Sequence, residues 1–370
     1  MSRSGLIGSI CYDDGKACEE SIATTPAPDV LHDLFDRMIA NQLTFCVLEV
    51  SSHALDQDRT AGLAFAGAVF TNLTQDHLDY HKDFETYYHA KRKLFCEEPF
   101  PACALINGED PYGKRLMAEM PGRFSTYGRV ASCDYFADEV HVGLNQIQFV
   151  LAHQGKRYLV EAPLALQHNV LNVLAALSVV SEQGLPLEEI IPHVLSFAQV
   201  PGRMEQIEEG QDFRVFVDYA HTPDALFNVL SSVANLTKGR VISVFGCGGD
   251  RDRLKRPLMG EIASKFSDIV VITSDNPRSE DPEIILREIE NGIDRKMGKA
   301  KVVTISDRSD AIGAAVKMAE AGDLILIMGK GHEHCQIIGT SMIPFSDQCV
   351  ARHWLRERLC LSSSEPARKK

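Results

Sequence analysis

Residues 268–278 read Asp-Ile-Val-Val-Ile-Thr-Ser-Asp-Asn-Pro-Arg, and this stretch decides the fold. The apolar run predicts a strand buried on both faces, which is typical of a parallel sheet. The cluster Asp275-Asn276-Pro277-Arg278 comes where that strand ends, and ligands of open α/β sheets bind beyond the carboxyl ends of the strands. Asp275 can hold an ammonium group and Arg278 a carboxylate, which suits a free amino acid. The alternative is an Asn-Pro turn with solvated charges.

Around this stretch, apolar runs alternate regularly with helical patterns. Five strands are predicted, at 213–218, 240–245, 268–274, 301–306 and 323–328. Helices are predicted at 223–236, 257–266, 282–293, 309–319 and 346–359. This alternation predicts a doubly wound, Rossmann-like C-terminal domain over 212–361, followed by a polar, disordered tail over 362–370.

Four of the predicted strands end in polar clusters, at 218–223, 246–251, 275–278 and 329–333. Each cluster alone could be a helix cap or a Gly-rich turn. Because the carboxyl ends of parallel strands meet at one sheet edge, four clusters together predict a pocket. The second cluster is a weak dinucleotide fingerprint, since Arg251 replaces its last glycine. His332 and His334 are more typical of hydrogen-bonding groups than of a metal site.

The N-terminal part, 1–211, is predicted to form a second α/β domain. Parallel strands are expected at 44–50, 66–73 and 102–107, and helices at 84–95 and 169–184. Short turn signals between 140–142, 147–152 and 156–162 predict antiparallel hairpins on a small subdomain.

Glu49 and His77 each follow a predicted strand of this domain, and Lys91 lies on the predicted helix after them. Carboxylate and imidazole groups at neighbouring strand ends suit Mg²⁺ or Mn²⁺. Taken singly, Glu49 or His77 would more often be a capping or hydrogen-bonding group, and only their shared position favours a metal site.

Composition narrows the class of protein. The 370 residues are 45% hydrophobic and 24% charged, with a net charge of −13, which argues against a general binder of nucleic acid or anionic membrane. No apolar run is long enough to span a membrane, and the N-terminus lacks a signal-peptide pattern. Ten cysteines without a C-x-x-C pair, several in apolar runs such as Cys46, Cys103 and Cys349, predict free buried thiols in a reducing cytoplasm.

Eight motifs resemble, in order, those of the Mur ligase family of peptidoglycan synthesis. They are Glu-Val-Ser-Ser-His-Ala-Leu at 49–55 and the motifs at 72–81, 167–172, 201–205, 218–223, 246–252, 275–278 and 329–333. The resemblance spans nearly the whole chain, from about Gly5 to Leu359. It implies a central ATPase-type domain followed by the Rossmann-like domain.

The resemblance also implies residue roles, as follows. The acceptor, a UDP-muramoyl-dipeptide, is bound by Thr24, Thr25, Ser51, Gln57 and Arg59. Mg²⁺ is bound by Glu49 and His77, beside a carbamylated Lys91. ATP is contacted by Asn169, Asn172, Arg203 and Asp218. The added amino acid is bound by Arg251, Asp275, Asn276, Arg278, Gly329 and Glu333.

The intact Asp275–Arg278 cluster resembles the branch of the family that adds meso-2,6-diaminopimelate rather than lysine. The implied reaction is ATP-dependent: a D-glutamyl γ-carboxylate becomes an acyl phosphate, and the diaminopimelate amine then displaces phosphate. Positioning and charge neutralisation, with Mg²⁺, would do most of the work. The implied partners are small molecules, with no nucleic acid or membrane partner, and the chain is expected to be a cytoplasmic monomer.

One expected element, the phosphate-cradling loop G-x-x-x-x-G-K-[ST], is not found in the sequence. The nearest match, 108–115, has Arg115 where Ser or Thr is needed, and acidic Glu109 and Asp110 where phosphates would lie, so it is read as a surface turn. We therefore expect the chain to begin inside the central domain, without its first strand and this loop. A non-catalytic remnant that only binds amino acid or nucleotide stays open; a folate-glutamylating relative is less favoured.

Overall fold

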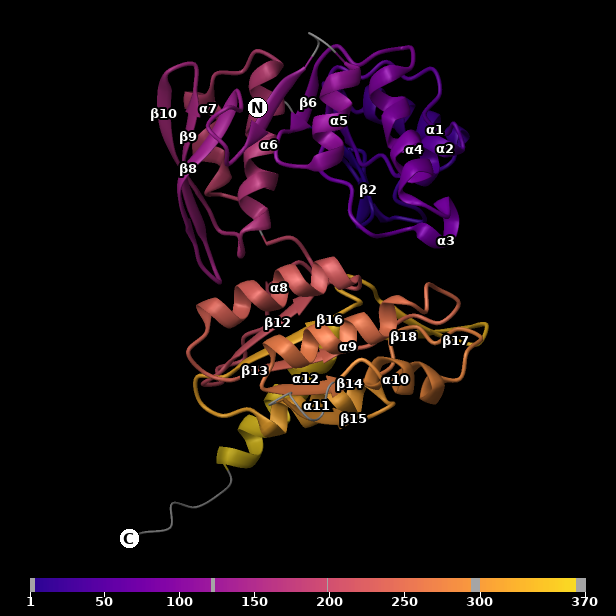
Figure 1. Cartoon of the computed structure of the whole chain (residues 1–370), viewed down its shortest axis with the longest axis vertical. Coiled ribbons are helices and arrows are strands. Elements are labelled where there is room, and N and C mark those ends of the chain that lie inside the picture. Colours follow the sequence, from indigo (N-terminus) through magenta and orange to yellow (C-terminus); the bar gives the residue numbers. More distant parts are fainter. Residues whose placement is uncertain (1–3, 121–123, 198, 294–299, 364–370) are drawn as a thin grey trace.

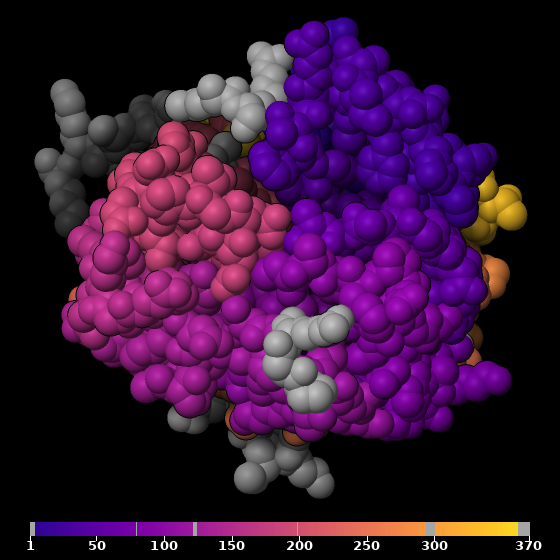
Figure 2. Space-filling view, turned by 90° about the horizontal axis from the view of Figure 1, so that it is seen from above, coloured from indigo at the N-terminus to yellow at the C-terminus, as the bar shows by residue number. Residues whose placement is uncertain are grey.

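The structure, a computed structural model, describes residues 4–120, 124–197, 199–293 and 300–363. Two halves are stacked along the long axis of the molecule (Figure 1). The N-terminal half carries two sheets, and the C-terminal half carries a third sheet and a short hairpin. Seen from above, the N-terminal segment lies beside the segments that follow it around residues 100–200 (Figure 2).

The first sheet has four short strands in the order β3-β2-β1-β4. They are β1 (Ser4–Ile7), β2 (Cys11–Asp13), β3 (Cys18–Glu20) and β4 (Phe45–Leu48), with β4 parallel to β1. Helix α1 (Pro28–Ala40) covers the sheet with Leu31, Leu34 and Met38. The strand predicted at 44–50 is present as β4, but it is an edge strand, and its Phe45 and Val47 side chains are 47% and 58% exposed.

The second sheet has six strands in the order β10-β9-β8-β7-β6-β5. They are β5 (Ala68–Phe70), β6 (Ala104–Asn107), β7 (Ser125–Gly128), β8 (Tyr135–Val142), β9 (Ile147–His153) and β10 (Lys156–Ala162). Strands β5 to β8 are parallel and β8 to β10 antiparallel. The predicted antiparallel strands are confirmed, but they extend the parallel sheet rather than form a sheet of their own, because β8 pairs with β7.

Helices of this half pack on the second sheet or lie at its edge. They are α2 (Ser52–Asp56), α3 (Leu78–His81), α4 (Phe84–Cys96), α5 (Pro111–Glu119), α6 (His168–Glu182) and α7 (Leu187–Val194). The predicted helices at 84–95 and 169–184 correspond to α4 and α6. Helix α3 lies at the end of this half that faces the other half (Figure 1).

The C-terminal sheet has the order β11-β12-β16-β13-β14-β15. Its strands are β11 (Glu205–Gln206), β12 (Arg214–Asp218), β13 (Val241–Phe245), β14 (Ile269–Ile272), β15 (Lys301–Thr304) and β16 (Leu324–Met328). All but β11 are parallel, and all five parallel strands were predicted. The last, β16, inserts between β12 and β13, which brings segments distant in sequence to one edge.

Helices cover both faces of this sheet, which confirms the doubly wound architecture. Helices α8 (Pro223–Leu236), α9 (Lys255–Phe266) and α10 (Pro282–Glu290) enclose one apolar core with the sheet. Helices α11 (Arg308–Met318) and α12 (Asp347–Ser363) enclose the other. In this half, the sequence patterns missed the short strand β11 and the hairpin of β17 (Cys335–Ile338) and β18 (Ser341–Pro344).

Several remaining expectations have mixed outcomes. Cys46 and Cys349 are exposed rather than buried, while Cys247 is buried.

Within the described ranges, no helix combines the length and apolarity needed to cross a membrane. The domain boundary at 211/212 stays a prediction, although β11 already joins the C-terminal sheet. Most of the predicted tail, 364–370, lies outside the described residues.

Candidate active site

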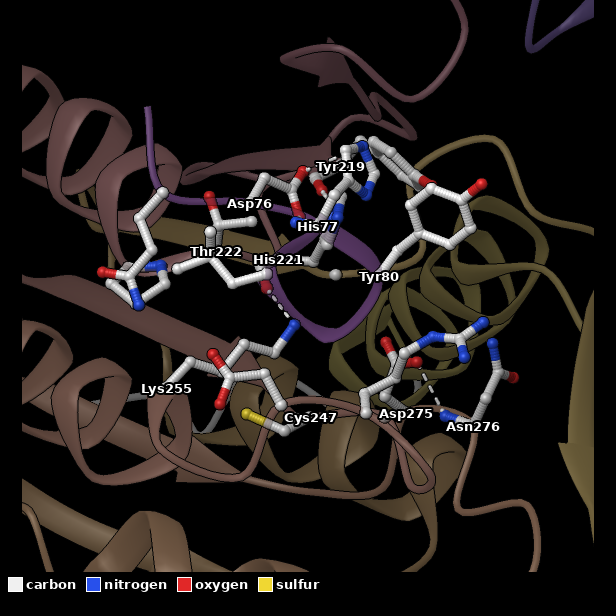
Figure 3. Close-up of a pocket in the computed structure, with 18 of the residues that line it drawn as sticks. Asp76, His77, Tyr80, Tyr219, His221, Thr222, Cys247, Lys255, Asp275 and Asn276 are labelled. Atoms are coloured by element: carbon white, nitrogen blue, oxygen red, sulfur yellow. Dashed lines mark hydrogen bonds and ion pairs between the residues drawn. The ribbon is translucent and has the colours of Figure 1, made fainter. Parts of the chain in front are cut away.

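A cavity of about 640 Å³ lies between the two halves. The N-terminal half contributes side chains around α3, including Asp76, His77 and Tyr80. The C-terminal half contributes the loops that follow β12, β13, β14 and β16. Figure 3 shows Asp76, His77 and Tyr80 on one wall and Lys255, Cys247, Asp275 and Asn276 on the other.

The four polar clusters predicted at strand ends come together as expected. Strands β12, β16, β13 and β14 are consecutive neighbours and parallel, so their carboxyl ends lie in a row. Each loop contributes to the cavity wall, with Tyr219, Gly246, Asp275 and Gly329 among the lining residues. The pocket predicted at this edge is therefore present.

These loops approach each other closely, and two glycines allow it. A Cβ on Gly249 would lie 1.9 Å from the Pro277 carbonyl oxygen, so the loops after β13 and β14 pack backbone to backbone. Gly329 has φ +117°, and a Cβ there would lie 2.8 Å from Oδ2 of Asp275. The Asp275 carboxylate thus packs directly against the backbone of Gly329.

Asn276 and Glu333 form one polar unit on the pocket wall. Asn276 Nδ2 donates to Glu333 Oε2 at 3.0 Å, and Asn276 Oδ1 accepts from the Ile337 backbone N–H at 3.0 Å. Asp275 Oδ1 accepts from the Asn276 backbone N–H at 2.7 Å. The carboxylates of Asp275 and Glu333 therefore lie on the same side of the pocket as the Asn276 amide.

Arg278 is held in an unusual backbone conformation, with φ +51°. Its N–H donates to the Ile337 carbonyl at 3.0 Å, and its carbonyl accepts from the Gly339 N–H at 2.7 Å, so the missed hairpin clamps this residue. Its Nη1 donates to the Gly249 carbonyl at 2.9 Å, which aims the guanidinium across the loop after β13. Arg251 is exposed and also lines the cavity.

Two fully buried arginines lie beneath these loops. Arg308 pairs with buried Asp347 at 2.7 Å and donates to the carbonyls of Ser274, two residues past β14, and Met328, the last residue of β16. Arg256 pairs with Glu280 and Glu288 and donates to the Gly248 carbonyl. Hydrogen bonding to Arg256 lowers the pKa of Glu280 to about 2. Sequence reasoning missed both arginines, because charged residues at helix starts are typically exposed.

The residues predicted to contact ATP are placed near the junction of the halves. Both carboxylate oxygens of Asp218 accept backbone N–H bonds at 2.8 Å, from Met204 and Ala220, and burial raises the pKa of Asp218. The Arg203 guanidinium lies 4.4 Å from the centre of the Tyr219 ring. The hydrogen bond from Met204 to Asp218 links the segment between the two halves to the end of β12.

Asn169 and Asn172, predicted to contact ATP as well, bond to each other on α6. Asn172 Nδ2 donates to Asn169 Oδ1 at 3.0 Å, and Asn169 Nδ2 donates to the Ala165 carbonyl at 2.6 Å. Among the cavity-lining side chains not singled out from the sequence, Lys255 donates to the His221 carbonyl at 2.9 Å (Figure 3).

The five residues predicted to bind the acceptor form one cluster beside Glu49. Thr25 Oγ1 donates to the Glu49 carbonyl at 2.7 Å and accepts from the Ser51 N–H at 2.9 Å. Arg59 donates to the Thr25 carbonyl at 2.7 Å and to Gln57 Oε1 at 2.6 Å. Thr24 joins through a 2.9 Å hydroxyl contact with Ser9. The structure thus brings these predicted residues together.

The predicted metal ligands are not assembled in the same way. Glu49 Oε2 accepts from the backbone N–H and the hydroxyl of Ser9, at 2.9 and 2.8 Å. His77 has φ +56°, and its Nε2 lies 3.6 Å from an Asp76 oxygen. No three His, Cys, Asp or Glu side chains within the described parts of the chain gather as a metal-binding group. Glu49 and His77 therefore stay predicted ligands, and Mg²⁺ bound by few protein groups would take its other ligands from water and phosphate.

Lys91 donates to the Asn72 carbonyl at 2.8 Å and lies 5.1 Å from the centre of the Tyr87 ring. Burial lowers the pKa of Lys91 to about 8, against the opposing effect of Asp110 and Asp76. A much larger fraction of this amine is consequently neutral at neutral pH than for an ordinary lysine. Carbamylation requires the neutral amine as nucleophile, so the environment of Lys91 suits that chemistry.

The segment at 108–115 is a helix start rather than a phosphate loop. Asp110 is the N-cap of α5, and its Oδ1 accepts from the N–H groups of Tyr112 and Gly113 at 2.9 Å. The expectation of a surface turn was only partly right, because Asp110 and Gly113 are buried. The carboxylate occupies the backbone N–H groups that a phosphate would need.

The chain is similar to known proteins over almost its whole length. The Mur ligase middle domain matches residues 1–180, and the Mur ligase glutamate ligase domain matches residues 202–331. A UDP-N-acetylmuramoyl-L-alanyl-D-glutamate–2,6-diaminopimelate ligase of Synechococcus elongatus is 46% identical over 359 residues, 96% of this chain and 72% of that protein. The ligase of that name from Thermosynechococcus vestitus is 45% identical over the same shares. The solved structure of a ligase with the same name is 34% identical, with a TM-score of 0.66, and covers 97% of this chain and 73% of that one.

Proposed function

Because the chain belongs to the Mur ligase family, whose members are ATP-dependent ligases, we propose that it adds meso-2,6-diaminopimelate to UDP-N-acetylmuramoyl-L-alanyl-D-glutamate. The product would be the muramoyl tripeptide of peptidoglycan synthesis. The proposal rests on the family and on one observation above all, the charge pattern of the pocket in the C-terminal half.

That pattern combines acidic and basic groups in one cavity. Asp275 and Glu333 supply carboxylates, and Arg278 and Arg251 supply guanidinium groups. Diaminopimelate carries an ammonium and a carboxylate at each end, and lysine lacks the distal carboxylate. A fixed guanidinium is the group that favours the ligand with the additional carboxylate, because it can bond both of its oxygens.

The proposed reaction has two transfers. An oxygen of the D-glutamyl γ-carboxylate attacks the γ-phosphorus of ATP, and the bond to ADP breaks. The diaminopimelate amine then attacks the acyl carbon, loses a proton as the C–N bond forms, and phosphate leaves. The chain's own residues would contribute by position: the C-terminal half would hold the amine, and the cluster around Thr25 and Ser51 in the N-terminal half would hold the acceptor.

We assign no step to Mg²⁺, since the described residues do not complete a site for it. Glu49 and His77 stay predicted ligands, and carbamylation of Lys91, which would turn a cation into a carboxylate, stays a prediction that its lowered pKa supports. We also infer that the chain acts as a monomer in the cytoplasm on small-molecule substrates.

A turnover assay tests the proposal. The chain is incubated with the UDP-muramoyl-dipeptide, ATP, and either meso-diaminopimelate or L-lysine, beside a version extended by the sequence encoded upstream of Met1. We expect phosphate release and tripeptide formation with diaminopimelate at least ~100-fold faster than with lysine, because a charged contact is lost with lysine. If neither version consumes ATP with diaminopimelate, the proposal is wrong, and the binding-only alternative takes its place.

A further inference from the structure

Lys330 is a buried cation at the floor of the amino-acid pocket. It lies two residues past the end of β16, and its side chain is 0% exposed. Its Nζ donates to Asn276 Oδ1 at 3.0 Å and to Glu333 Oε2 at 2.7 Å. We propose that Lys330 is a positioning residue, which fixes the Asn276 amide and the Glu333 carboxylate for the ammonium group of the incoming amino acid. This inference rests on the proposed function.

The first consequence of Lys330 concerns the orientation of the Asn276 amide. Two donors, Lys330 Nζ and the Ile337 backbone N–H, both point at one atom of that amide, each at 3.0 Å. Only the amide oxygen can accept from both, so the NH₂ group must face the other way. There it donates to Glu333 Oε2 at 3.0 Å. Lys330 therefore orients the Asn276 side chain so that its NH₂ group, and not its oxygen, faces Glu333.

The second consequence concerns Glu333. Its Oε2 accepts from both Lys330 and Asn276, which holds the carboxylate in one rotamer. Its Oε1 has no hydrogen-bond donor among the described residues, and Glu333 lines the cavity with its side chain 31% exposed. One oxygen is thus anchored, and the other is available to a ligand. An ammonium group is the donor that such an oxygen binds most strongly.

The third consequence concerns charge. Asp275 and Glu333 line the same cavity, so two negative charges face one pocket. Lys330 places a positive charge behind Glu333 without occupying the side that faces the ligand. A neutral residue at position 330 would remove the positive charge bonded to Glu333 and leave Oε2 of Glu333 without its shortest bond.

The test is binding of meso-diaminopimelate to the full chain by titration calorimetry, for wild type, Lys330→Met and Lys330→Gln. Arg240→Met is the matched control, because Arg240 pairs with Asp323 in the same domain but does not line the cavity. Thermal unfolding checks that each variant folds. We expect the Kd to rise at least ~10-fold in both Lys330 variants and to change less than ~2-fold in the control, as for loss of a charge-assisted hydrogen bond.

A double-variant comparison separates positioning from mere stability. In a Glu333→Gln background, Lys330→Met should raise the Kd by less than ~3-fold, since Lys330 acts through the group already altered. If Lys330→Met does not fold, the same comparison is made with Lys330→Gln. If a folded Lys330 variant binds diaminopimelate within ~2-fold of wild type, or if its effect is undiminished by Glu333→Gln, the inference is overturned. Failure of the wild type itself to bind would instead count against the proposed function.

Discussion

The two walls of the cleft differ in how firmly their polar groups are held. On the C-terminal wall, Asn276, Glu333 and Arg278 are each fixed by bonds to other loops, and buried Lys330, Arg308 and Arg256 lie beneath them. In the N-terminal half, the Glu49 carboxylate accepts bonds from Ser9 alone among the described residues, and the His77 side chain on the cavity wall is 42% exposed. Under the proposed function, the residues predicted to select the amino acid are therefore more firmly held than the residues predicted to bind the metal.

The sheets explain this difference. The C-terminal sheet has neighbours on both sides of the four strands that carry the pocket, and helices on both faces. In the N-terminal half, Glu49 follows β4, an edge strand whose apolar side chains are exposed, and the segment with His77 follows β5, an edge strand of a different sheet. Side chains at open edges have fewer neighbours to fix them.

The largest expected effect is on the C-terminal wall. Arg308→Met should lower the free energy of unfolding by about 3–5 kcal/mol, because it leaves buried Asp347 unpaired and the Ser274 and Met328 carbonyls without a donor. Urea unfolding measures it, with Lys156→Met, which breaks an exposed pair with Glu188, as the control expected to leave the midpoint unchanged. Equal midpoints for both variants would contradict a rigid C-terminal wall.

The next effect concerns Lys91 and depends on pH. Its folded pKa of about 8 lies below the usual lysine pKa of 10.5, so the unfolded chain binds more protons between these values and stability rises with pH there. In CO₂-free buffer, the stability difference between wild type and Lys91→Met should move by up to about 3 kcal/mol in favour of wild type from pH 8 to 10.5. Urea unfolding at several pH values measures this, and a difference that stays constant across the range would refute the lowered pKa.

A smaller effect concerns selection of the amino acid. Arg278→Ala should raise the KM for diaminopimelate about 10- to 100-fold and that for ATP less than twofold, as for loss of a hydrogen bond to a charged group. The backbone conformation should persist, since an alanine at φ +51° is no more strained than the arginine. Arg253→Ala, which breaks a surface pair with Glu288, is the control. Equal changes in both KM values would show that Arg278 does not act by binding the amino acid.

The smallest effect is expected on the N-terminal wall. Ser9→Ala removes one of the two bonds to Glu49 Oε2 and should cost about 0.5–1 kcal/mol of stability, because Glu49 keeps the Ser9 backbone N–H and contact with solvent. Chemical denaturation resolves a change of this size when both proteins are measured together. A loss as large as that of Arg308→Met would show that this wall is as firmly built as the other.

Much of the fold could be predicted because it follows from apolar periodicity. The strands β12, β13, β14 and β16 are short, mostly apolar runs, so the sequence alone predicted that Asp218, Gly246, Asp275 and Gly329 lie at one sheet edge. The hairpin β17–β18 was missed because most of its residues are exposed and its apolar pattern is short. The strands β1 to β3 were missed because each has only three or four residues.

The buried cations could not be predicted, for a different reason. Lys330, Arg308 and Arg256 are placed by contacts between loops far apart in sequence, such as Arg308 with Asp347. Local sequence marks such residues as exposed, since an isolated buried charge is unfavourable and its partner is visible only in three dimensions. The left-handed backbone of Arg278 likewise depends on Ile337 and Gly339 of the missed hairpin.

The central claim is that the C-terminal wall alone selects an amino acid with a distal carboxylate. Titration calorimetry of this chain with meso-diaminopimelate and with L-lysine, repeated for Arg278→Ala, tests it most directly. We predict that wild type binds diaminopimelate at least ~10-fold more tightly than lysine, and that Arg278→Ala reduces this preference to less than ~3-fold. Equal affinity for both amino acids in wild type, or an undiminished preference in Arg278→Ala, would contradict the claim.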